Sequence, residues 1–288
     1  MKKTRAFLKW AGGKYSLVEA ITAKLPKGRV LVEPFVGAGS VFLNTQYDAY
    51  LLADINPDLI DFYNLLKNSP EKVIRVAQSL FVANNNQQQA YYDLRDAFNL
   101  SSDPVDRAAL FLFLNRHGYN GLCRYNRKGE FNVPFGKYKK PYFPEKELWF
   151  FAEKAQKATF ICECYSNTFQ RLEPDHVVYC DPPYVPLSHS ANFTTYAAKG
   201  FSLDDQALLA GLARSTAHEL HIPVLISNHA TPLTHELYRG AVLHELQVKR
   251  SISRNGGSRN KVGELLALYS PKTASRQGVT LESADCLG

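Results

Sequence analysis

Cysteine is scarce in this chain, which has five cysteines in 288 residues and no pair with a two-residue spacer. Secreted disulfide frameworks use dense, even sets of cysteines, so this odd set indicates reduced thiols in an intracellular protein. Cys162 and Cys164 are one residue apart in an apolar setting that suits a strand, and no second pair follows, which disfavours zinc. We therefore expect neither a disulfide framework nor a bound metal.

Long apolar runs are also missing. The apolar residues 6–8 are cut off by Lys9, so the start of the chain does not form the apolar region of a secretory signal. No run approaches the ~20 apolar residues that span a membrane. Because 45% of the residues are apolar, the chain can bury a full core. We expect a cytoplasmic protein with one large domain and an inserted lobe.

Acidic residues are nearly absent from residues 116–140, which hold seven Lys or Arg against one Glu, in a chain of net charge +7. Such a cluster favours a polyanionic partner. Tyrosine and phenylalanine alternate with the basic residues, which suits phosphate contact and base stacking. Spaced glycines predict a β-hairpin or ordered loop rather than a helix. The alternative is a solvated basic loop with structural aromatics.

A strand, glycine turn, helix, strand and acid follow one another from residue 30 to Asp54. Residues 30–33 and 50–54 read as buried strands, and residues 40–46 as a helix. This is the layout of a nucleoside-binding half of a doubly wound sheet. Position 42 is Phe, so the third glycine of a dinucleotide fingerprint is missing, which favours a nucleoside cofactor without phosphates over NAD. The alternatives are a tight turn for the glycines and a helix-capping acid for Asp54.

The run 177–180 reads as another buried strand and leads into Asp181-Pro182-Pro183-Tyr184. The two prolines remove backbone donors and fix φ, so the strand ends there. A carboxylate and an aromatic ring are thereby held at the sheet edge where open α/β sheets bind ligands. The alternative is a proline terminator with a surface Asp and Tyr.

The remaining pattern predicts an α/β sheet interrupted by helices. Ser16 is expected to cap a helix over 17–24, and Ser202 to cap one over 203–220. Helices are expected at 57–67, 70–81, 90–99, 104–116, 145–157 and 232–239, and further strands at 159–162, 223–227, 242–249 and 262–269. The helical stretch before residue 117 predicts the inserted lobe. The polar loop 84–89 is expected to be mobile, and the tail 271–288 disordered.

The order of these motifs resembles one enzyme group. The turn Phe35-Val36-Gly37-Ala38-Gly39, a basic middle segment and Asp181-Pro182-Pro183-Tyr184 resemble the α group of S-adenosylmethionine-dependent DNA adenine methyltransferases. Within that group the chain is similar to the bacterial Dam family, over essentially residues 1–270. The segments that carry this resemblance are 7–15, 32–44, 115–142, 181–193 and 251–257.

The resemblance implies a fold, a domain division and an activity. It implies a Rossmann-like doubly wound sheet with one antiparallel strand, a catalytic domain at 1–56 and 145–270, and a DNA target-recognition domain inserted at 57–144. It implies transfer of a methyl group from S-adenosyl-L-methionine, which leaves S-adenosyl-L-homocysteine, to adenine N6 in GATC after base flipping. The partner would be double-stranded DNA in a bacterial or phage nucleoid. We expect a monomer in solution, with more than one molecule able to share a DNA.

The resemblance also assigns residues. The catalytic residues would be Asp181, Pro182 and Tyr184. The cofactor residues would be Trp10, Ala11, Gly12, Lys14, Glu33, Pro34, Phe35, Gly37, Gly39, Ser40, Asp54 and Asp181. The DNA-binding residues would be Lys9, Arg95, Arg116, Tyr119, Asn120, Leu122, Arg124, Asn126, Asn132, Pro134, Lys137 and Tyr138. Among these, Tyr119 would fill the space of the vacated base and Arg124 would read guanine, for which a guanidinium fork is suited.

Position 137 departs from the family, which is expected to have Arg there, so a point charge would replace a forked phosphate contact. A second basic stretch without acids, residues 249–261, predicts a hairpin loop on the DNA backbone.

Chemistry supports these roles independently. The lone pair of an adenine amino group is delocalised, so two acceptors, the Asp181 carboxylate and the Pro182 carbonyl, would be needed to draw that nitrogen toward tetrahedral geometry. Tyr184 would stack on the base. Methylation of cytosine N4, RNA or glutamine, or a catalytically idle DNA-binding protein, remain alternatives. Asp rather than Asn at position 181 disfavours the glutamine enzymes.

Overall fold

The computed structural model describes residues 3–185, 201–248 and 262–271. Its centre is a seven-stranded sheet in the order β3-β2-β1-β4-β5-β7-β6. The strands are β1 (Val30–Glu33), β2 (Ala49–Asp54), β3 (Ala158–Cys162), β4 (His176–Cys180), β5 (Val224–His229), β6 (Val242–Val248) and β7 (Val262–Tyr269). Strands β1 to β5 pair in parallel, and β7 pairs antiparallel with both β5 and β6. This confirms the predicted Rossmann-like sheet with an antiparallel strand.

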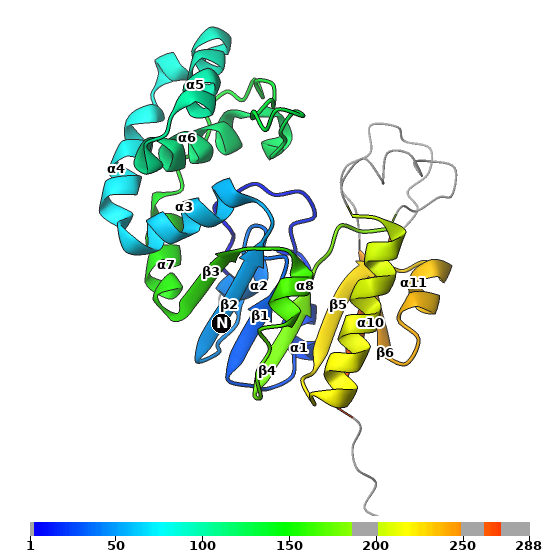
Figure 1. Cartoon of the computed structure of the whole chain (residues 1–288). Coiled ribbons are helices and arrows are strands. Elements are labelled where there is room, and N and C mark those ends of the chain that lie inside the picture. Colours follow the sequence, from blue (N-terminus) through cyan, green and yellow to red (C-terminus); the bar gives the residue numbers. More distant parts are fainter. Residues whose placement is uncertain (1–2, 186–200, 249–261, 272–288) are drawn as a thin grey trace, which may run out of the picture.

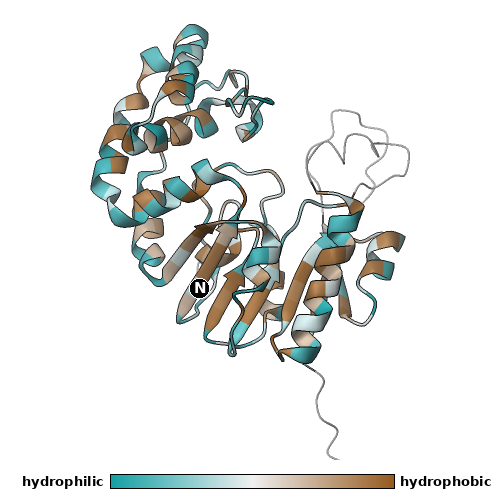
Figure 2. Ribbon diagram, viewed as in Figure 1, coloured by the Kyte–Doolittle hydropathy of each residue, from teal (hydrophilic) through white to brown (hydrophobic). Residues whose placement is uncertain are grey.

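Helices cover both faces of the sheet, as Figure 1 shows. One face packs on α1 (Val18–Lys24), α2 (Ser40–Asn44), α3 (Pro57–Asn68) and α7 (Glu145–Lys154). The other packs on α8 (Tyr165–Phe169), α10 (Leu203–Glu219) and α11 (Pro232–Leu237). Figure 2 shows the strands as almost continuously hydrophobic, as expected for a sheet buried on both faces.

The strand order switches sides of the sheet between β1 and β4, which are neighbours and parallel. It runs outward through β2 to β3 on one side and from β4 to β5 on the other. The carboxyl ends of β1, β2 and β4 carry Glu33, Asp54 and Asp181. These carboxylates therefore lie at the edge and switch point where open α/β sheets bind ligands.

A group of helices stands beyond this edge of the sheet (Figure 1). It contains α4 (Pro70–Leu80), η1 (Ala83–Asn85), α5 (Gln88–Leu100) and α6 (Pro104–His117). Helix α6 is buried nearly all round, as its apolar sequence predicts. Helix α3 contacts β2 and β3 as well as α4 and α6, so it joins this group to the sheet.

Residues 117–144 form an ordered loop beside α5 and α6. Two antiparallel bridges, Gly118 with Phe135 and Tyr125 with Phe131, give it a hairpin character. One short turn of 3-10 helix, η2 (Tyr119–Gly121), interrupts it. The prediction of a hairpin or ordered loop is thus confirmed, and η2 is a single turn that it did not include.

Some local predictions are wrong. The N-cap of α1 is Leu17 without a side-chain bond, not Ser16. The loop expected at 84–89 is partly helical, and the Asn86 side chain donates to the Tyr138 carbonyl at 2.9 Å. Helix α8 was not predicted. Ser202, by contrast, caps α10 in a capping box, as expected. The predicted loop at 249–261 and the predicted disordered tail lie outside the described residues, apart from Pro271.

Candidate active site

Asp54, at the end of β2, anchors the glycine turn. Its Oδ2 accepts the Gly37 amide at 3.0 Å, and its Oδ1 accepts the Asn56 amide at 3.0 Å. Burial raises the pKa of this carboxyl, while the amide donors oppose the rise. The next residue, Ile55, is 76% exposed, so an apolar side chain stands beside the acid at the sheet edge. Sequence reasoning missed Ile55, although an apolar residue just past a strand-ending acid was visible.

Gly37 brings the glycine turn against Trp10 of the N-terminal segment, residues 7–15. Its φ is +47°, a left-handed conformation that glycine tolerates, and a Cβ there would lie 2.9 Å from Trp10 Nε1. The Tyr63 hydroxyl donates to the Gly37 carbonyl at 2.7 Å. The turn is therefore held from both sides and leaves no room for a side chain.

Glu33, at the end of β1, is 2% exposed, and its Oε1 has no hydrogen-bond partner among the described residues. Burial raises its pKa well above the usual range, and the neighbouring Asp181 raises it further. A buried acceptor without a partner is costly in a folded protein and indicates a place for a ligand donor.

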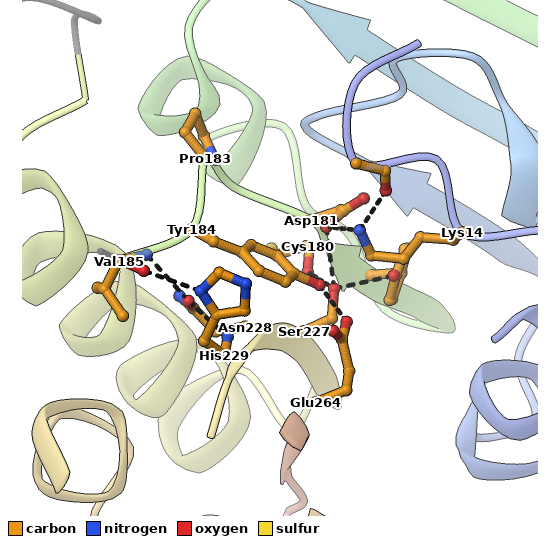
Figure 3. Close-up of polar contacts among 12 residues, drawn as sticks. Lys14, Cys180, Asp181, Pro183, Tyr184, Val185, Ser227, Asn228, His229 and Glu264 are labelled. Carbon is orange, nitrogen blue, oxygen red and sulfur yellow. Dashed lines mark hydrogen bonds and ion pairs between the residues drawn. The ribbon is translucent and has the colours of Figure 1, made fainter. Parts of the chain in front are cut away.

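Asp181 receives two donors on one oxygen (Figure 3). Lys14 Nζ lies 2.8 Å and Ser227 Oγ 3.1 Å from Asp181 Oδ1, and Lys14 Nζ also donates to the Gly12 carbonyl at 2.6 Å. Asp181 Oδ2 has no partner within the described part of the chain. Ser227, on β5, was not among the predicted site residues, because nothing near it in the sequence marks it.

Tyr184 presents its ring beside this carboxylate. Lys14 Nζ lies 4.5 Å from the ring centroid, and the His229 ring meets Tyr184 edge-on at 4.8 Å. The Tyr184 hydroxyl donates to Glu264 Oε1 of β7. Burial, then Asp181, raises the tyrosine pKa well above its usual value, so the hydroxyl stays protonated. Glu264 was also missed, because it is brought here by pairing between strands.

The backbone of the tetrapeptide is fixed by side chains of α10 and β5. Gln206 donates to the Pro183 carbonyl at 2.6 Å, and Asn228 Oδ1 accepts the Val185 amide at 3.2 Å. The Pro182 carbonyl has no hydrogen-bond partner among the described residues. Two acceptors of consecutive residues, Asp181 Oδ2 and the Pro182 carbonyl, thus have no partner in the described part of the chain.

Lys9 connects the N-terminal segment to the basic loop, residues 116–144, which comprises the end of α6 and the ordered loop that follows it. Its amide donates to Asn115 Oδ1 at 2.9 Å, its Nζ donates to the Arg116 carbonyl at 3.1 Å, and Nζ lies 3.6 Å from the Tyr138 ring centroid. Burial and Arg116 lower the pKa of Lys9 to about 8. Residues 7–15 therefore reach both the basic loop, through Lys9, and Asp181, through Lys14.

The basic loop itself exposes many of the predicted DNA residues. Arg124 Nε donates to Asn132 Oδ1 at 2.7 Å, and one terminal Arg124 nitrogen donates to the Asn132 carbonyl at 3.0 Å. Tyr119 is 51% exposed, next to Asn120 with a left-handed φ of 53°. Tyr119, Asn120, Arg124, Pro134 and Lys137 are exposed, and Arg116, Leu122, Asn126, Asn132 and Tyr138 are partly buried.

Arg95 is the predicted DNA residue that lies outside the basic loop and the N-terminal segment. It sits on α5 with its guanidinium 4.7 Å from the Tyr92 ring centroid.

Three further observations concern metal ligands, membrane spans and thiols in the described residues. No group of three or more His, Cys, Asp and Glu side chains in the described ranges could hold a metal ion. No helix among them is long and apolar enough to cross a membrane. Cys123, Cys162, Cys164 and Cys180 are free thiols.

Comparison with known proteins identifies relatives of this chain. Residues 10–252 match the family described as D12 class N6 adenine-specific DNA methyltransferase. The chain is 64% identical over 276 residues to a DNA adenine methylase of Vibrio cholerae, covering 96% of this chain and 100% of that protein. It is 61% identical over 275 residues to a DNA adenine methylase of Escherichia coli, covering 96% of this chain and 99% of that protein.

Proposed function

Because the chain belongs to the D12 class of N6 adenine-specific DNA methyltransferases, we propose that it methylates adenine within GATC in duplex DNA after flipping that base out. The observation that carries the proposal is the pair of acceptors without a partner in the described residues, Asp181 Oδ2 and the Pro182 carbonyl, in the tetrapeptide that ends in Tyr184. Two acceptors match the two N–H groups of an adenine amino group.

The cofactor proposed for this site is S-adenosyl-L-methionine, which supplies an electrophilic methyl group when bound. The unpartnered Glu33 Oε1 is suited to a ligand ammonium group, and the Asp54 oxygens to ribose hydroxyls. The turn at Gly37, with no room for a Cβ beside Trp10, admits a ligand close to the backbone. The exposed Ile55 is an apolar wall next to Asp54 that suits a purine ring. The other proposed cofactor residues are Ala11, Gly12, Lys14, Pro34, Phe35, Gly39 and Ser40.

The protein's contribution to the reaction is to hold the amino group. Asp181 Oδ2 and the Pro182 carbonyl accept its two N–H bonds, which turns the nitrogen lone pair toward the methyl group. Stacking on Tyr184 contributes about 1–3 kcal/mol. Lys14 Nζ now bonds Asp181 Oδ1 and lies over the Tyr184 ring, so it stands where the base would stack. Lys14 therefore has to move off the ring as the base enters.

Apart from Lys9, the proposed DNA contacts lie in residues 57–144, for which we propose the role of target-recognition domain. Base flipping costs a few kcal/mol, and the exposed ring of Tyr119 is suited to fill the gap. Arg124, Leu122, Pro134 and Lys9 would contact bases. Phosphates would be held by Arg95, Arg116, Asn120, Asn126, Asn132, Lys137 and Tyr138. One monomer treating each strand in turn is sufficient, and we propose that the enzyme works on the bacterial nucleoid in the cytoplasm.

The test uses the full chain with a labelled methyl donor and duplexes that contain or lack GATC. The label is expected on the adenine of GATC alone, and equal labelling of duplexes in which the G, T or C of GATC is replaced would contradict the GATC assignment. Asp181→Asn is expected to abolish transfer while binding of DNA and of S-adenosylhomocysteine persists. Loss of both binding activities in a folded variant would contradict the catalytic role of Asp181.

A further inference from the structure

A chain of side-chain contacts joins the end of β2 to the basic loop. It begins at Asn56, two residues after Asp54, whose Nδ2 donates to Cys123 Sγ at 3.3 Å. Cys123 Sγ contacts the Tyr125 hydroxyl at 3.6 Å, and that hydroxyl donates to Asp58 Oδ2 at 2.6 Å. The loop on either side of Arg124 is thus tied to the first turn of α3.

Asp58 is fixed from a second direction. Its Oδ1 accepts a bond from a terminal nitrogen of Arg107 at 2.5 Å. Arg107 also donates to the carbonyls of Phe98 at 2.8 Å and Ser101 at 3.1 Å, and its guanidinium lies 4.4 Å from the Phe98 ring centroid. The carboxylate that receives Tyr125 is therefore held by the corner between α5 and α6, where a half-buried ion pair is less screened than one on the surface.

The Tyr125 ring and hydroxyl have separable tasks. The ring packs edge-on against Phe131 across the bridge of the loop, with centroids 5.7 Å apart. The hydroxyl alone reaches Asp58 and Cys123. Burial raises the pKa values of both Tyr125 and Cys123, so each group keeps its proton at neutral pH and can donate.

Arg124 depends on this anchor for its position. Its own guanidinium bonds are to Asn132, which belongs to the same loop, so they orient the side chain within the loop but not relative to the sheet. The tie through Tyr125 leads to Asp58 and Asn56 at the start of α3, directly after the acid that anchors the glycine turn.

We infer that Tyr125 is a specificity-positioning residue, which sets Arg124 relative to the cofactor end of β2 through Asp58, Cys123 and Asn56. Cofactor binding and discrimination between target sequences are then energetically coupled, because ordering the turn at Asp54 also orders the loop that reads bases. This inference rests on the proposed function, in which Arg124 reads a base.

Tyr125→Phe removes the hydroxyl and keeps the ring. Tyr142→Phe is the matched control, because the Tyr142 hydroxyl in the same loop bonds only Glu147 of α7 among the described residues, at 3.1 and 3.4 Å. Arg124→Ala provides the reference for lost base reading. Each protein is titrated with a GATC duplex and with a duplex changed at one base, with and without S-adenosylhomocysteine, by fluorescence anisotropy, and thermal unfolding confirms that it is folded.

The wild type and Tyr142→Phe are expected to prefer GATC more strongly when S-adenosylhomocysteine is present. In Tyr125→Phe the ratio of affinities for GATC and for the changed duplex should fall about tenfold, and it should no longer depend on S-adenosylhomocysteine. The affinity for the changed duplex should be retained. Unchanged discrimination, or an equal loss on both duplexes, would overturn the inference. If Tyr125→Phe unfolds, Cys123→Ala is used instead, because it removes only the sulfur contacts to Asn56 and Tyr125. This variant must then show a weaker effect of S-adenosylhomocysteine on the preference for GATC. A wild type without preference for GATC would instead contradict the proposed function.

Discussion

Replacement of Gly37 by alanine separates backbone strain from a specific collision in the proposed cofactor site. An alanine at φ +47° costs about 1–2 kcal/mol of folding free energy because its Cβ crowds the following carbonyl. The new Cβ would also lie 2.9 Å from Trp10 Nε1 and 3.0 Å from Trp10 Cδ1. Since non-bonded atoms prefer about 3.5 Å, the indole has to retreat by about 0.6 Å.

Gly240→Ala is the matched control for the strain. Gly240 has φ +94°, and a Cβ there would meet nothing within 4 Å. Both variants are expected to lose about 1–2 kcal/mol of unfolding free energy in urea titrations. Only Gly37→Ala should also lose affinity for S-adenosylhomocysteine, by about tenfold or more, because a misplacement below 1 Å is costly in a preorganised site.

Isothermal titration calorimetry gives the affinity, and tryptophan fluorescence in a Trp149→Phe background reports the displacement of the Trp10 indole. If both variants bound S-adenosylhomocysteine as tightly as the wild type, the turn and Trp10 would not lie against the cofactor. If both lost affinity equally, the loss would come from reduced stability and not from the collision.

Substitutions of two further residues, Glu33 and Tyr184, test the electrostatics and the stacking surface of the site. Glu33→Gln should flatten the dependence of stability on pH. Because the pKa of buried Glu33 is raised in the folded protein, its contribution to stability is fully present below the unfolded pKa near 4.5 and is lost as pH rises through the folded pKa. The wild-type melting temperature should therefore fall more than that of the variant between pH 5 and 8. Parallel profiles would show that Glu33 is not buried and protonated. Tyr184→Phe keeps the ring and loses the bond to Glu264, so it should slow single-turnover methyl transfer about tenfold. Tyr184→Ala should slow the transfer further, because it also removes the stacking surface. Equal rates for the two Tyr184 variants would refute the stacking role.

The sheet and its acids were predictable because their signals are local. The strands before Asp54 and Asp181 are short, buried runs that end at a turn or at prolines, and strand ends of one parallel sheet meet at one edge. Ser202 was recognisable as a cap from its place before an amphipathic helix. The basic loop was recognisable by its composition.

The features that were missed depend on long-range pairing or on short elements. Ser227 and Glu264 reach Asp181 and Tyr184 only because β5 lies beside β4 and β7 lies beside β5 in the sheet order. Helix α8 has five residues, too few for a periodic pattern. Ser16 has the side chain of a cap, but the helix starts one residue later, and boundaries are set by tertiary context.

The place of β7 in the sheet has a consequence for synthesis of the protein. Among the described strands β7 is the last in the chain, yet it lies between β5 and β6. A nascent chain that has already made β6 therefore cannot seat it until β7 leaves the ribosome, and until then β5 keeps an open edge. The Glu264 carboxylate that holds Tyr184 arrives in the same step. An unfinished chain should thus contain every residue of the Asp181 to Tyr184 tetrapeptide and still have no properly held ring on which to stack a base.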